Sequence, residues 1–158
     1  MKEINFKKRE TIEQVEESND LAPKFDKNGL IPVVTTDYSS GEMLMQGYMN
    51  EEALKKTITI GEAVYYSRSR KTIWHKGKKS GLIQVIKEIR IDDDQDCIWL
   101  RVNAKGGASC HVGYRSCFYR SIPFGKKQIE NLKLKFEEEE KVFNPKDVYG
   151  DAPNPTKL

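Results

Sequence analysis

Residues 82–103, LIQVIKEIRIDDDQDCIWLRVN, contain two β-rich runs on either side of an acidic segment. Apolar and polar side chains alternate over much of residues 82–91, which is the pattern of a strand with one buried face. Residues 97–103 are a second β-rich run, and the acidic segment Asp92–Asp96 lies between the two runs. We therefore expect two long strands joined by a hairpin turn that carries carboxylates.

Upstream of this hairpin, the sequence predicts a second hairpin and a helix. Residues 30–36 are β-rich, residues 37–41 form a turn, and residues 42–49, EMLMQGYM, are the expected partner strand. Asn50 is a favourable N-cap, with two glutamates in the first turn after it. A helix is therefore expected over residues 51–60, ending at Gly61. The other upstream predictions are a short helix within residues 8–18 and strands over residues 62–67 and 71–76.

The C-terminal part has a different pattern. Residues 124–141 are rich in lysine and glutamate, with Ile129, Leu132 and Phe136 at helical spacing, which predicts an amphipathic helix. Residues 144–158 are rich in proline and turn formers, which predicts an extended tail. The expected organisation is an N-terminal helical extension (1–28), one main domain (29–122) and a C-terminal helix and tail (123–158). The strand pattern alone indicates an α+β fold.

Composition excludes several classes of protein. The chain has 158 residues, of which 32% are charged and 37% hydrophobic, and this length suits one domain. No apolar run approaches the ~20 residues of a membrane helix, and no secretory signal is present at the N-terminus. The net charge of +3 is small and spread along the chain, which argues against a dedicated nucleic-acid binder. We expect a cytoplasmic protein that binds neither membranes nor nucleic acid.

The acidic turn is a candidate metal site. Asp92, Asp94 and Asp96 alternate in sequence, and oxygen ligands at this density suit a hard cation such as Mg²⁺. The alternative is a solvated acidic hairpin tip. The turn lacks the glycine and the distal glutamate of a calcium-binding helix-loop-helix loop, so that motif is excluded.

The three cysteines indicate a second candidate metal site. An odd number of cysteines in a reducing compartment argues against a disulfide framework. Cys110 and Cys117 lie in the segment SCHVGYRSCFYR with His111 beside the first of them. A catalytic zinc needs three protein ligands and an open position, so these two thiols and a third ligand from elsewhere would satisfy it. The alternative is that the thiols are simply buried.

A third group of residues suits a phosphate or a base. Residues 67–70 read SRSR, and guanidinium forks with hydroxyls bind phosphate oxygens well. Trp74 follows, and its ring either stacks on a base or fills the core. Surface charge is the commoner explanation of an SRSR turn, so this signal is weak by itself.

These segments in this order resemble the phosphoribosyl-AMP cyclohydrolase family. The matching stretches are GLIPVV, GEMLMQGYMNEEALKKT, YYSRSRKTIWHKGKKSG, the acidic residues 92–96 and SCHVGYRSCFYR, within residues 29–122. The resemblance implies hydrolysis of the bond between ring nitrogen 1 and carbon 6 of the adenine in phosphoribosyl-AMP, a step of histidine biosynthesis. It also implies an intertwined homodimer and a mostly β fold, with a twisted sheet or partial barrel capped by the 51–60 helix.

The resemblance also implies roles for individual residues. Cys110 and Cys117 match zinc ligands, with a third cysteine supplied by the partner subunit, and Asp92, Asp94 and Asp96 match magnesium ligands. His111 matches the active-site histidine and is expected to move a proton to the departing ring nitrogen. The candidate substrate-binding residues are Ser67, Arg68, Ser69, Trp74, Lys76, Ser80 and Arg115.

The chain departs from the family pattern at the third cysteine. The family has D-C-D-x-D in the acidic turn, whereas this chain has Asp93 in place of the cysteine and a cysteine at position 97. Either Asp93 binds zinc through a carboxylate oxygen, which its backbone position favours, or Cys97 reaches the metal across the turn. A third alternative is a degraded zinc site. Lys78, where the family commonly has glutamate, is a second departure.

Three functions compete on this basis. The first is a stand-alone zinc-dependent phosphoribosyl-AMP cyclohydrolase, because the residues after Ile122 are too few for the pyrophosphohydrolase domain that is often fused to it. The second is a non-catalytic dimeric relative that binds nucleotide or metal. The third, a zinc-dependent base deaminase, is disfavoured because its H-x-E and P-C-x-x-C motifs are missing.

Overall fold

The computed structural model describes residues 3–125 and 132–158, and strands outnumber helices in this part of the chain. The helices are α1 (Ile12–Glu17), α2 (Glu51–Ile60) and α3 (Pro145–Tyr149), with a 3-10 turn, η1 (Lys105–Gly107). The strands are β1 (Ile31–Asp37), β2 (Met43–Met49), β3 (Val64–Ser67), β4 (Thr72–His75), β5 (Gln84–Ile91), β6 (Ile98–Ala104), β7 (Arg120–Ser121) and β8 (Lys135–Phe136). The α+β class with mostly strands is confirmed.

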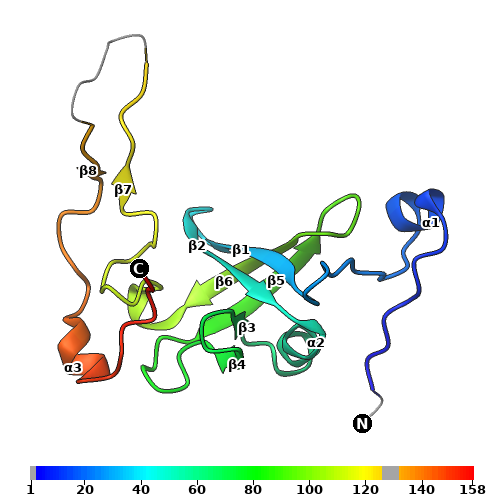
Figure 1. Ribbon diagram of the computed structural model, residues 1–158, viewed down its shortest axis with the longest axis horizontal. Coiled ribbons are helices and arrows are strands. Elements are labelled where there is room, and N and C mark those ends of the chain that lie inside the picture. The colour runs from blue at the N-terminus through cyan, green and yellow to red at the C-terminus, as the bar shows by residue number, and fades with distance from the viewer. Residues whose placement is uncertain (1–2, 126–131) are drawn as a thin grey trace.

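A four-stranded sheet in the order β2-β1-β6-β5 lies at the centre of the molecule (Figure 1). β1 pairs antiparallel with β2, and β5 pairs antiparallel with β6, as the two predicted hairpins require. The hairpins are joined by parallel pairing of β1 with β6. β3 and β4 form a separate two-stranded sheet, and α2 packs against β2 and β3.

The core lies between the central sheet, α2 and β3. Alternate side chains of β1 and β6 are fully buried, among them Ile31, Val33, Leu100 and Val102. Leu54 of α2 packs into the same cluster. The period-2 burial of the strands reproduces the alternation in the sequence, which is why their positions could be predicted.

The β5–β6 hairpin confirms the predicted acidic turn. The Asp92 N–H donates to the Cys97 carbonyl at 3.1 Å, so these two residues face each other across the turn. The Gln95 N–H donates to the Asp92 carbonyl at 3.1 Å, and Gln95 itself adopts the left-handed conformation with φ 57°. The ends of the loop are therefore held by the backbone.

The predicted boundaries of α2 are confirmed. The Asn50 side chain accepts a hydrogen bond from the Ala53 N–H at 2.8 Å, and Gly61 ends the helix in the left-handed conformation. The first helix is shorter than the 8–18 segment that contains it. It begins after Thr11, whose side chain caps the Gln14 N–H, and its C-cap is Ser18.

The helix predicted over residues 124–141 is wrong in the part that the structure describes, while residues 126–131 lie outside the described residues. β8 instead pairs antiparallel with β7. The aromatic side chains explain this arrangement, because Phe136 packs on the stacked rings of Tyr114 and Tyr119. The predicted tail over 144–158 is also not wholly extended, since α3 forms within it behind the N-cap Asn144.

The central sheet is open, and the described strands close no barrel (Figure 1). The β7–β8 segment stands away from the sheet at one end of the molecule, and α1 lies at the other end. Among the described residues, no helix has the length and apolar character needed to span a membrane.

Candidate metal and nucleotide site

The loop that carries Cys110 and Cys117 is held in place by backbone hydrogen bonds. The Cys110 N–H donates to the Tyr114 carbonyl at 3.2 Å, and the Gly113 N–H donates back to the Cys110 carbonyl at 3.0 Å. The Cys117 N–H donates to the Leu44 carbonyl of β2 at 2.7 Å. The loop therefore folds back on itself and is fastened to the edge of the central sheet, which brings the two cysteines together.

The thiols of Cys110 and Cys117 interact with each other. That contact lowers the pKa of Cys110 to about 6, and the Lys76 ammonium adds to the effect. The same contact raises the pKa of Cys117, because the pair holds one negative charge more easily than two. Cys110 is buried and Cys117 is exposed as a residue, so the pair lies near the surface. A thiol with a lowered pKa is a ready metal ligand.

Lys76 enters this site from the end of β4. Its side chain is 2% exposed, and burial lowers the pKa of its ammonium while the two nearby thiols oppose that shift. Its Nζ lies 5.3 Å from the centre of the Trp74 ring. Gly77 follows with φ 86°, and a Cβ there would lie 2.3 Å from the backbone nitrogen of Ile83. The glycine is therefore required for the chain to turn directly after the buried lysine.

His111 has one ring nitrogen without a partner. Its Nε2 atom is buried and accepts or donates no hydrogen bond within the described part of the chain. Burial lowers the pKa of the imidazole, with a further contribution from Lys76, while the Asn154 side chain hydrogen-bonds the ring and opposes the shift. The ring is therefore neutral at neutral pH and keeps a free nitrogen beside the thiols. A buried nitrogen without a hydrogen-bond partner is available to bind a ligand of the protein.

A buried polar network that the sequence analysis missed ends at Ser109, next to Cys110, and so supports the cysteine loop. The Tyr65 hydroxyl donates to Gln84 at 2.6 Å and lies 2.7 Å from the Thr35 hydroxyl. The Gln84 amide then donates to the Ser109 hydroxyl at 3.2 Å, next to Cys110. Gln84 occupies the apolar phase of its strand, and a polar side chain in that phase is the signal that could have revealed the network.

The acidic turn forms the second candidate metal centre. Asp92, Asp94 and Asp96 each offer a carboxylate oxygen, and these atoms lie within 4.8 Å of one another. The pKa of Asp96 is raised to about 6, first by its hydrogen bond with Asp92, then by burial and by Asp94. One Asp92 oxygen accepts the N–H groups of Asp96 and Cys97 at 2.9 and 3.0 Å. Three converging carboxylates, two of which raise the pKa of the third, fit a divalent cation.

The two candidate metal centres are not brought together within one chain. The acidic turn precedes β6 and the cysteine loop follows it, so a strand of about 20 Å separates them by the usual rise per residue. Within residues 3–125 and 132–158, the acidic triad is the one group of three or more potential ligands that converges. The thiol pair therefore has no third ligand from its own chain among these residues.

The other predicted substrate-binding residues lie in three places: Ser67, Arg68 and Ser69 at the β3–β4 turn, Ser80 in the loop between β4 and β5, and Arg115 in the cysteine loop. The Ser67 and Ser69 hydroxyls lie 3.5 Å apart, and Arg68 packs over the Tyr48 ring at 4.1 Å. Ser80 accepts the Leu82 N–H at 3.2 Å in the loop after Lys76. Arg115 forms ion pairs with Glu42 and Glu138, so its charge is already matched.

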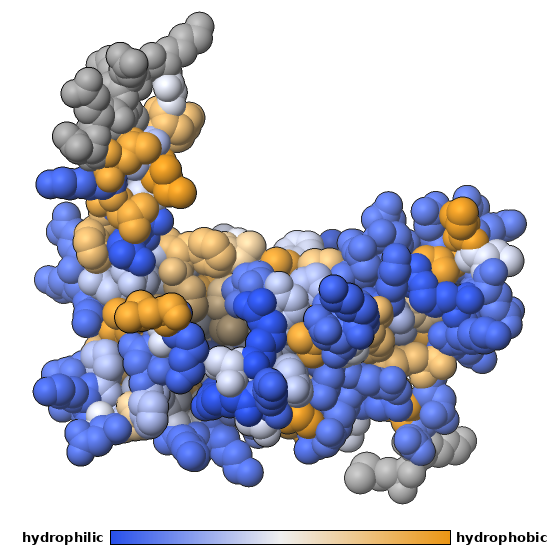
Figure 2. Space-filling view, in the orientation of Figure 1, coloured by the Kyte–Doolittle hydropathy of each residue, from blue (hydrophilic) through white to orange (hydrophobic). Residues whose placement is uncertain are grey.

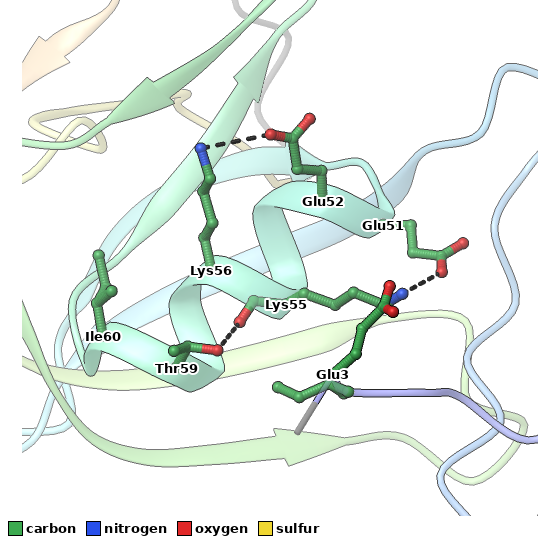
Figure 3. A pocket seen from close by; sticks show the side chains of 8 residues that line it. Glu3, Glu51, Glu52, Lys55, Lys56, Thr59 and Ile60 are labelled. Atoms are coloured by element: carbon green, nitrogen blue, oxygen red, sulfur yellow. Dashed lines mark hydrogen bonds and ion pairs between the residues drawn. The ribbon is translucent and has the colours of Figure 1, made fainter. Parts of the chain in front are cut away.

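A hollow on the outer face of α2 lies away from these groups (Figure 3). Its charged side chains pair with one another, since Lys55 binds Glu51 at 2.8 Å and Lys56 binds Glu52 at 3.3 Å. Helical pairs of this kind are ordinary surface contacts. The thiol pair and the acidic turn therefore remain the candidate sites.

The comparisons with known proteins agree on one family. The sequence profile of the family described as Phosphoribosyl-AMP cyclohydrolase matches residues 45–119. A relative named Phosphoribosyl-AMP cyclohydrolase from Rhodopseudomonas palustris (strain HaA2) is 50% identical over 139 residues, covering 88% of this chain and 93% of the relative. A relative of the same name from Nitrobacter winogradskyi is 46% identical over 136 residues, covering 86% of this chain and 92% of the relative.

Proposed function

This chain belongs to the phosphoribosyl-AMP cyclohydrolase family, and we propose that it catalyses the zinc-dependent hydrolysis of the N1–C6 bond of phosphoribosyl-AMP in histidine biosynthesis. In this reaction water adds its oxygen to carbon 6, the bond from carbon 6 to nitrogen 1 breaks, and nitrogen 1 takes up a proton. The product is the open formimino-carboxamide ribonucleotide. The observation that carries the proposal is the Cys110–Cys117 thiol pair beside Lys76 and His111.

The donor set of the cysteine loop fits zinc. Two thiols in contact, one with a lowered pKa, are soft ligands of the kind that zinc prefers. When bound, zinc supplies a Lewis acid that makes a water nucleophilic near neutral pH. The buried Lys76 ammonium stabilises the negative charge that two thiolates bring to this loop.

His111 is proposed to carry the proton. Its imidazole is neutral because burial lowers its pKa, and its free Nε2 atom is available to the reacting groups. The ring can therefore take a proton from water and deliver it to ring nitrogen 1. Asn154 of the C-terminal segment opposes the lowering of the imidazole pKa, so a residue outside the cysteine loop also influences His111.

Trp74 and its neighbouring cations are proposed to bind the nucleotide. Arg70 and Lys76 lie 5.6 and 5.3 Å from the centre of the Trp74 ring. An indole ring can stack on the adenine of the nucleotide, and the two cations can bind the phosphates of the nucleotide. Because Lys76 is buried next to the thiols, its position supports a role at the reacting end of the substrate more than at an exposed phosphate.

The acidic turn is proposed to bind Mg²⁺ through Asp92, Asp94 and Asp96. The support is the convergence of three carboxylate oxygens and the raised pKa of Asp96, which shows that the metal-free cluster retains a proton easily. A divalent cation would replace that proton and relieve the repulsion among the carboxylates. Its charge is then available to a substrate phosphate or to a bound water.

A homodimer is proposed to complete the zinc site. One support is the distance between the thiol pair and the acidic turn within one chain, since the missing ligand is expected from that turn in the partner. A second support is the exposed apolar surface at and beside the β7–β8 segment, where apolar side chains gather (Figure 2). Its residues are Phe118, Ile122, Phe124, Leu132, Leu134 and Phe136. A two-stranded segment is marginally stable alone, so a second copy that covers it is expected.

The proposal is tested by turnover and metal content together. The purified chain should consume phosphoribosyl-AMP, followed by the ultraviolet absorbance of the product, and should contain one zinc per subunit. Cys110→Ser and Cys117→Ser should each lose zinc and activity, because two remaining ligands hold the metal too weakly. Full zinc in both variants would overturn the ligand assignment, and zinc-loaded protein without turnover would favour a non-catalytic relative.

A further inference from the structure

The N-terminal segment Arg9–Lys24, which contains α1, lies against the acidic turn although about 70 to 85 residues separate them in sequence (Figure 1). We propose that this segment is a positioning element that holds the acidic turn in the shape needed for its metal, with Gln95 and Arg9 as the two positioning residues. The inference rests on the magnesium site of the proposed function and assigns a role to a part of the chain that supplies no ligand.

Gln95 is the first contact. It lies between Asp94 and Asp96, adopts the left-handed conformation with φ 57°, and is 4% exposed. A residue with a Cβ rarely adopts this conformation unless its surroundings impose it. The buried side chain therefore helps to hold the turn in its shape.

The Gln95 amide is hydrogen-bonded almost to its full capacity by the N-terminal segment. Its Oε1 atom accepts the Ala22 N–H at 2.8 Å, and its Nε2 atom donates to the carbonyls of Val15 and Asp20 at 2.9 and 3.0 Å. The Gln95 carbonyl also accepts the Lys24 N–H at 2.7 Å. The amide thus forms hydrogen bonds with three backbone groups of one segment, which a shorter side chain could not reach.

Arg9 is the second contact. Its guanidinium donates to the Ala22 carbonyl at 2.7 Å and to the Asp94 carbonyl at 2.8 Å. The planar fork makes both bonds at once, whereas a lysine would present a single ammonium. Arg9 therefore ties the backbone of one proposed ligand directly to the N-terminal segment.

The consequence for metal binding is a preformed turn. Its carboxylates repel one another in the metal-free protein, and this repulsion favours opening of the turn. The two contacts anchor the backbone at Asp94 and Gln95, in the middle of the triad, and oppose that opening. Mg²⁺ then binds to carboxylates that already converge. Its binding free energy is not reduced by the cost of ordering these ligands.

The test measures Mg²⁺ affinity by calorimetry on the full-length, zinc-loaded protein. Gln95→Ala should raise the Mg²⁺ dissociation constant about tenfold or more, in the range found when residues supporting metal ligands are changed. Arg9→Ala should act in the same direction, and Arg9→Lys should recover part of the loss. Zinc content should remain that of the parent protein in all three variants.

Two matched controls separate positioning from general effects. Lys71 is also a non-glycine residue in the left-handed conformation, φ 51°, but lies in the exposed β3–β4 turn, so Lys71→Ala should leave Mg²⁺ affinity unchanged. Lys8→Ala removes an exposed positive charge next to Arg9 and should also leave it unchanged. Hydrogen exchange of the Asp96 and Cys97 amides in chelator should be faster in Gln95→Ala and Arg9→Ala.

The outcomes are distinguishable. If the parent protein binds Mg²⁺ and neither Gln95→Ala nor Arg9→Ala weakens that binding, the inference is overturned and the proposed function stands. If the parent protein binds no Mg²⁺, the magnesium site itself is wrong and the inference fails with it. If Gln95→Ala does not fold, Arg9→Ala, at a half-buried position, decides the question by the same two measurements.

Discussion

Asp93 and Cys97 have different surroundings, and the difference bears on which of them completes the zinc site. The Cys97 thiol is half-buried and lies 3.8 Å from the Ile98 carbonyl. Burial raises its pKa, and the neighbouring carboxylates of Asp92, Asp96 and Asp94 raise it further, so its thiolate is disfavoured. Asp93 is exposed on the same turn, where it would be accessible to the proposed second subunit. These surroundings support Asp93 as the third ligand.

Substitutions at these two positions should therefore have opposite effects on zinc. Asp93→Ala should lose the metal, and Asp93→Cys should bind it as tightly as the parent protein or more tightly, because a thiolate suits zinc at least as well. Cys97→Ser should keep the zinc and cost about 1 kcal/mol of stability through packing. Metal analysis after dialysis checks all three. Zinc retained in Asp93→Ala but lost in Cys97→Ser would assign the ligand to Cys97.

The raised pKa of Asp96 predicts a pH dependence of stability in the metal-free protein. Its pKa is about 6 in the folded chain against an ordinary value of 3.8, so the folded state binds the proton more tightly than the unfolded state. The contribution of Asp96 to stability is then fully present below about pH 4 and is lost as the pH rises through about 6.

Asp96→Asn, which mimics the protonated side chain, isolates this contribution. In chelator at pH 7 the variant should melt at a higher temperature than the parent protein, and the difference should shrink as the pH falls toward 4. Thermal unfolding at several pH values measures it. A difference in melting temperature that stays constant from pH 4 to 7 would show that Asp96 does not titrate in this range.

At the scale of elements, the C-terminal segment is fastened to the cysteine loop. The Val142 N–H donates to the Gly113 carbonyl at 2.7 Å, and the Glu138 carboxylate accepts the N–H groups of Arg115 and Ser116 at 3.0 and 3.1 Å. Asn154 contacts His111 from the same segment. The segment predicted as a helix and tail therefore acts as a support for the loop that carries the thiols.

Gly113→Ala tests this support. Gly113 has φ 107°, and a Cβ there would lie 2.4 Å from the Phe143 carbonyl oxygen, so the substitution must move the C-terminal segment away. We expect a loss of stability on the order of 2 kcal/mol together with weaker zinc binding.

Gly125→Ala is the matched control for that experiment. Gly125 also has positive φ, 122°, but a Cβ there would meet no atom of the described residues within 4 Å. It carries the same kind of backbone strain without the collision, so it should cost less stability and leave zinc binding unchanged. Urea unfolding and zinc titration compare the two, and equal zinc affinities would show that the C-terminal segment does not support the loop.

At the scale of the whole molecule, the two candidate metal centres lie at opposite ends of β6, which makes a site shared between subunits testable with mixed dimers. A Cys110→Ser chain and an Asp93→Ala chain should each be inactive alone. In a mixed dimer, one of the two sites draws intact residues from both chains. Random mixing at equal concentrations should therefore restore about a quarter of the parent activity, since half of the dimers are mixed and each has one good site. Activity that does not recover after subunit exchange would argue against a shared site.

Most of the local structure could be predicted from the order of the amino acids. The two hairpins, the limits of α2 and the acidic turn were predicted because each depends on period-2 alternation, an N-cap or a turn within a few residues. The motifs around Cys110, Cys117 and the acidic turn also indicated the family before any coordinates, because their residue types and order are specific. The helix expected beyond residue 124 failed where aromatic packing on Tyr114 and Tyr119 outweighed a weak helical pattern.

The contacts between residues far apart in the chain could not be predicted in this way. The parallel pairing of β1 with β6, the burial of Lys76 beside the two thiols, and the contacts of Arg9 and Gln95 across the acidic turn all join segments far apart in the chain. Local periodicity indicates which face of an element is buried but not which partner covers it. That choice is made by the packing of the whole chain, where many weak contacts between distant segments together offset the entropy of ordering them.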